Sequence, residues 1–60
     1  MNKVEQLRRD YEKKYGKRLN KEQIDSYIDD LFVLVKDDFT SEQLGEYLMN
    51  TKLSLKSKGL

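Results

Sequence analysis

The 60-residue chain contains no cysteine, histidine, proline, tryptophan or alanine. Without cysteine and histidine it can form neither a disulfide bond nor a zinc site of the usual kind, and it has no thiol nucleophile or imidazole base. Most enzyme chemistry depends on such groups. We therefore expect a protein that is not an enzyme, with no catalytic residues, no cofactor, no metal site and no small-molecule substrate.

Long apolar runs are also missing from the chain. The longest run, at residues 31–35, is far shorter than the roughly 20 residues that a membrane-spanning helix needs. The first residues contain no apolar stretch of the signal-peptide kind. We therefore expect no membrane association and a cytoplasmic location.

The apolar content, 37% of the residues, is high enough for a folded chain but small in absolute terms. A domain of this size buries only about 60% of the surface that its unfolded chain exposes. One domain over residues 1–60 is expected, and its marginal size favours a homo-oligomer or a complex with a larger protein.

Three segments carry the apolar spacing of amphipathic helices. We expect helices over about 2–15, 20–37 and 40–56, which form an all-α, small three-helix bundle. Gly16 is placed to end the first helix. Residues 57–60 are expected to fray. The buried stripe of the second helix comprises Ile24, Tyr27, Ile28, Leu31 and Val35.

The second and third helices begin with the same local signal. Asn20 and Gln23 match a capping box, and so do Thr40 and Gln43. The segments LNKEQI and FTSEQL are 20 residues apart, and a tyrosine follows each at the same distance. A duplicated helical unit would explain this similarity, but capping selects the same residue types at any helix start, and we favour the second explanation.

Charge is segregated along the chain although its sum is only +1. Residues 1–20 hold seven basic and three acidic side chains, whereas residues 21–39 hold two basic and six acidic ones. The basic segment suggests a nucleic-acid contact, with the candidate residues Arg8, Arg9, Lys13, Lys14, Lys17 and Arg18. The alternative is a solvated face that complements the acidic second helix. We favour this alternative because acidic residues are interleaved with the basic ones.

The acidic second segment suggests a surface for a basic partner. Its adjacent pairs, Asp29-Asp30 and Asp37-Asp38, each point in two directions on a helix, which suits neither acid–base catalysis nor a metal site. No segment has the spacing of a calcium-binding loop.

The apolar residues exceed what one small core can bury. Val33 lies about 180° from the buried stripe, so residues 31–35 are apolar nearly all round the helix. Exposed apolar patches mark protein interfaces. The candidate protein-interface residues are Phe32, Val33, Phe39, Met49 and Leu53.

These observations predict a small, non-enzymatic helical module for protein–protein interaction. It would act as a regulator, adaptor or inhibitor by binding a protein partner or a second copy of itself. A nucleic-acid-binding accessory protein that uses the basic first helix is the alternative. The alanine-free composition, rich in lysine, asparagine and leucine, would suit an AT-rich bacterium or phage.

Overall fold

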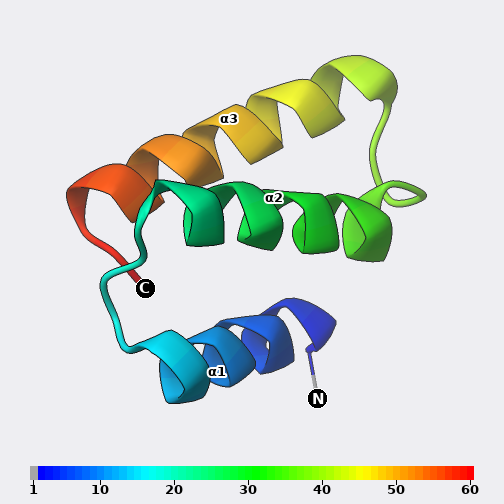
Figure 1. Cartoon of the computed structure of the whole chain (residues 1–60). Coiled ribbons are helices and arrows are strands. Elements are labelled where there is room, and N and C mark those ends of the chain that lie inside the picture. Colours follow the sequence, from blue (N-terminus) through cyan, green and yellow to red (C-terminus); the bar gives the residue numbers. More distant parts are fainter. Residues whose placement is uncertain (1) are drawn as a thin grey trace.

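The computed structural model describes residues 2–60, and these form three helices with no strand: α1 (Lys3–Tyr15), α2 (Lys21–Val35) and α3 (Ser41–Ser57). The predicted all-α three-helix bundle is confirmed. Helix α2 lies between the other two and packs against both, whereas α1 and α3 do not pack directly against each other (Figure 1). None of these helices combines the length and the apolar content that a membrane crossing requires.

The core is built around α2. Four residues of the predicted stripe are buried: Ile24, Tyr27, Leu31 and Val35. The fifth, Ile28, is half-buried at the edge of the core. The loop residue Leu19 and two residues of α3 complete the core, and α1 contributes no fully buried side chain. Half-buried residues such as Leu7 and Tyr11 hold α1 against this core.

Both predicted capping boxes are present. The Asn20 side chain accepts a hydrogen bond from the Gln23 amide at 2.9 Å, and the Gln23 side chain accepts one from the Asn20 amide at 3.0 Å. Thr40 and Gln43 make the equivalent pair at 3.2 Å each. These bonds satisfy amides that a helix start otherwise leaves without a partner, which fixes where α2 and α3 begin.

Helix α2 ends at Val35, two residues before the predicted end at residue 37. A turn follows, in which the Asp38 amide donates to the Val35 carbonyl oxygen at 2.9 Å. Carboxylates are unfavourable at the negative end of a helix dipole. Ending the helix before Asp37 and Asp38 keeps both carboxylates out of its last turn.

The C-terminal residues are held against the α1–α2 connection. Gly59 has a φ of 78°, and this turn directs the Leu60 amide to the Lys17 carbonyl oxygen at 2.7 Å. Leu60 itself is half-buried against the core. Figure 1 shows the C-terminus beside the connection between α1 and α2. These contacts oppose the fraying expected for residues 57–60.

Candidate interaction surfaces

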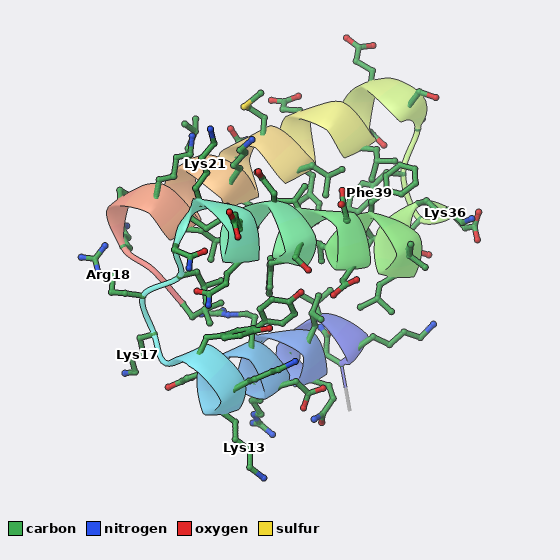
Figure 2. All side chains as sticks on the ribbon, in the orientation of Figure 1. Lys13, Lys17, Arg18, Lys21, Lys36 and Phe39 are labelled. Carbon is green, nitrogen blue, oxygen red and sulfur yellow. The ribbon has the colours of Figure 1, made fainter. Side chains whose placement is uncertain are left out.

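The five predicted interface residues are all exposed, with between 37% and 64% of their surface accessible. Phe32 alone lines a hollow between α2 and α3. Val33 and Leu53 lie outside that hollow. Phe39 stacks on Tyr47 with the ring centroids 5.0 Å apart, so one face of its ring is already covered. Figure 2 shows Phe39 at the α2–α3 connection.

The hollow that Phe32 lines is a groove between the C-terminal half of α2 and the N-terminal half of α3. It has a volume of about 500 Å³. We call it the α2–α3 groove, and its lining residues are Phe32, Lys36, Asp37, Ser41, Leu44, Gly45 and Leu48. Leu44 is buried and Leu48 half-buried, so the groove has an apolar floor. Met49 follows Gly45 by one helical turn and lies on the same side of α3.

Gly45 is the residue of the groove that sequence reasoning missed. Glycine in a helix interior is about 0.5–1 kcal/mol less favourable than alanine. The backbone of Gly45 has no positive φ, and a Cβ added there would meet no heavy atom within 4 Å beyond its chain neighbours and the backbone of its own helix. Neither conformation nor packing within residues 2–60 therefore requires a glycine here. An isolated glycine inside a helical pattern was the signal that could have identified the groove.

Charge around the α2–α3 groove is predominantly negative at the end that holds Phe32. Lys36 and Asp37 line the groove, and further exposed acidic residues lie one to three positions from a lining residue in the sequence: Asp29, Asp38 and Glu42. Farther along the two helices, Lys52 of α3 pairs with Asp25 of α2 at 3.3 Å. That pair is neutral in sum, so it adds no net charge to the groove.

The six basic residues proposed for nucleic-acid contact do not form one free cationic face. Arg8 donates to the backbone oxygen of Leu60 at 2.6 Å, and Arg18 donates to the Ser57 carbonyl oxygen at 3.0 Å. Cations are favoured where the last carbonyl groups of a helix lack partners. Lys14 lies over the Tyr15 ring, 5.2 Å from its centroid.

The remaining basic residues point in different directions. Figure 2 shows Lys13 extending away from the bundle, while Lys17 and Arg18 extend from the α1–α2 connection. The predicted electrostatic match of α1 with α2 involves no ion pair, because Lys52–Asp25 is the one ion pair within residues 2–60. Two of the basic side chains, Arg8 and Arg18, therefore contact the C-terminal residues, and others extend into solvent.

Hydrogen bonds of Tyr11 connect α1 to α2 instead. Its hydroxyl donates to the Asp30 carboxylate at 2.7 Å and lies 2.9 Å from the Ser26 hydroxyl. Burial raises the pKa of Tyr11, the Ser26 hydrogen bond lowers it, and the Asp30 carboxylate raises it. The net direction is upward, so Tyr11 stays protonated and continues to donate.

Comparison of the chain with protein-family models, with curated proteins and with solved structures gives no match.

Proposed function

We propose that this chain is a protein-interaction module, rather than an enzyme, and that its α2–α3 groove binds a basic amphipathic helix of a partner protein. The observation that carries the proposal is Gly45. A residue that weakens its own helix, with open space where its side chain would be, suits a position that another chain approaches closely.

The apolar surface around Gly45 supports the same function. Phe32 is exposed in the groove, and Met49 is exposed one helical turn after Gly45. Aromatic residues and methionine are enriched at protein interfaces. A partner side chain placed over Leu48 would remove this surface from water. Burial of such side chains is the main source of affinity in protein complexes.

A helix suits the groove better than an extended segment. The walls of the groove are helices, which satisfy their own backbone hydrogen bonds, so there is no free strand edge for an extended peptide to join. An amphipathic helix needs no such edge, because it binds through apolar side chains at a spacing of three and four residues. The acidic residues near Phe32 favour lysine or arginine on the flanks of that helix.

Two designed peptides test this proposal. One is an amphipathic helix of leucine and lysine, and the other has glutamate in place of every lysine. We expect the lysine peptide to shift the amide resonances of Phe32, Gly45 and Leu48, and the glutamate peptide to leave them unchanged. The change of Phe32→Ala should weaken binding by about tenfold, which corresponds to loss of one interface anchor.

The matched control is Leu53→Ala, since Leu53 is an exposed leucine of α3 outside the groove. The proposal would be disproved if Phe32→Ala and Leu53→Ala weaken peptide binding equally, or if the peptide shifts resonances of α1 instead. Sedimentation equilibrium without peptide gives a further outcome. If a dimer forms that protects Phe32 and Gly45, the occupant of the groove is a second copy and not a basic partner.

A further inference from the structure

Helix α3 carries two large apolar side chains on a face that no other helix covers. Leu44 and Leu55 of α3 are buried in the core, on the side that packs against α2. Met49 and Leu53 lie one helical turn apart and are 57% and 55% exposed. Figure 1 shows α2 beside α3 and α1 on the far side of α2, so within residues 2–60 neither helix covers this pair.

Charged residues extend this face of α3 in both directions from Met49. Glu46 and Glu42 precede Met49 by three and seven residues, and Lys52 and Lys56 follow it by three and seven. Residues three, four or seven positions apart share one face of a helix. The face is therefore acidic before Met49 and basic after it. We call this surface the α3 strip, and its residues are Glu42, Gly45, Glu46, Met49, Lys52, Leu53 and Lys56.

The charges of the α3 strip complement each other when two copies of α3 run antiparallel. If Met49 lies on a two-fold axis, residues at equal distances before and after Met49 face each other. Glu42 of one copy then faces Lys56 of the other, and Glu46 faces Lys52. Two-fold symmetry forms each of these contacts twice. A parallel pair would instead bring like charges together, so the antiparallel arrangement is favoured.

These charged side chains are available for contacts with a second copy. Glu42, Glu46 and Lys56 are exposed, and none of them forms an ion pair within residues 2–60. Lys52 pairs with Asp25 at 3.3 Å. Its ammonium group has three N–H donors, so it can contact a second carboxylate as well.

Gly45 and Leu53 give the antiparallel pair a matching shape. Each is four residues from Met49, so Leu53 of one copy lies opposite Gly45 of the other. A Cβ at position 45 would meet no heavy atom within 4 Å beyond its chain neighbours and the backbone of its own helix. This open space lets a side chain of a neighbouring helix approach the backbone closely.

We propose that two copies of this chain associate through their α3 strips as an antiparallel, two-fold symmetric pair, with Met49 on the axis and Leu53 of each copy against Gly45 of the other. One pair of helices buries less than the roughly 800 Å² per partner of a standard interface, so we expect a dissociation constant on the order of 0.1–1 mM.

This dimer does not rest on the proposed peptide binding, but both involve Gly45. A bound peptide and a second copy therefore exclude each other. Peptide titrations at protein concentrations well below the dissociation constant of the dimer measure the monomer.

Translational diffusion, measured by NMR over protein concentrations that span this dissociation constant, tests the dimer. We expect diffusion of the wild-type chain to slow as concentration rises, with shifts in the amide resonances of Met49 and Leu53. Glu42→Lys should weaken association by about tenfold, because it places like charges together at both symmetric contacts. Lys56→Glu should weaken it equally. An equal mixture of the two variants should associate as wild type does, because every contact then joins opposite charges.

The matched control is Glu5→Lys, which makes the same change of net charge in the first turn of α1, a helix that does not pack against α3. It should associate as wild type does. The proposal is overturned if the wild-type chain stays monomeric over this range, or if the mixture associates no better than either variant alone. Concentration-dependent shifts at Phe32 and Leu48 instead of Met49 and Leu53 would also overturn it, because they place the second copy in the α2–α3 groove. The peptide proposal fails separately, if the leucine–lysine peptide does not bind.

Discussion

Burial changes sharply from residue to residue along α2. Leu31 has no exposed surface, whereas Val33, two residues later, is 64% exposed. Two helical steps rotate a side chain by about 200°, so these neighbours lie on opposite faces. Apolar residues of similar character therefore differ in role, and only those on the face of Leu31 contribute to the core.

Truncating Leu31 should cost most of the stability of the fold. We expect Leu31→Ala to lower the free energy of unfolding by about 2–5 kcal/mol, because a fully buried side chain leaves a cavity. A chain of 60 residues is stable by only roughly 3–9 kcal/mol. Urea denaturation followed by circular dichroism measures the loss, and a decrease below about 1 kcal/mol would show that the core collapses around the cavity.

Tyr27 should make stability depend on alkaline pH. Its pKa is raised in the folded state, chiefly by burial. The folded chain therefore binds the phenolic proton more tightly than the unfolded chain, so the stability that this proton provides is present below about pH 10 and is lost as pH rises through the folded pKa. Thermal melts of Tyr27→Phe should show a smaller decrease between pH 9 and 11 than wild type. Identical decreases would contradict this linkage.

At the scale of the helices, local sequence predicts where a helix begins more accurately than where it ends. The capping residues Asn20 and Thr40 identify where α2 and α3 begin, because a capping box needs only residues three apart. The end of α2 depends instead on where Asp37 and Asp38 lie relative to the helix dipole. The two similar helix starts also differ, since Leu19 is buried and Phe39 is exposed.

The two caps should differ in strength. We expect Asn20→Ala to lower the free energy of unfolding by about 1 kcal/mol and Thr40→Ala by less. The hydrogen bonds of the Asn20 box measure 2.9 and 3.0 Å, against 3.2 Å for both bonds of the Thr40 box. Urea midpoints of the two variants give the comparison. A larger loss for Thr40→Ala would mean that bond length does not rank these caps.

At the scale of the whole molecule, contacts between distant residues complete the fold. The helices and the stripe around Leu31 could be predicted because they depend on spacing within a few residues. The hydrogen bonds of Arg8 and Arg18 could not, since their acceptors are 52 and 39 residues away in the sequence. Of the residues that line the α2–α3 groove, only Phe32 was a predicted interface residue, because the groove itself depends on how α3 packs against α2.

Gly59 should be essential for holding the C-terminal residues. Its φ of 78° is rare for other residues, and an added Cβ would overlap the Lys17 carbonyl oxygen. We expect Gly59→Ala to lower the free energy of unfolding by about 1 kcal/mol or more and to speed exchange of the Leu60 amide. Gly16→Ala is the control, because Gly16 also has a positive φ but has open space around it. Equal losses would show that backbone conformation alone accounts for the effect.

Gly45 provides the most direct test of the proposed protein-binding function. The measurement is a paired one on Gly45→Ala: its melting temperature, and its dissociation constant for the leucine–lysine peptide. A groove shaped for a close partner predicts a more stable protein, by up to about 1 kcal/mol, that binds the peptide about tenfold more weakly. Val33→Asp, outside the groove, should bind as wild type does. A Gly45→Ala protein that is stabilised and binds the peptide with unchanged affinity would contradict the proposal.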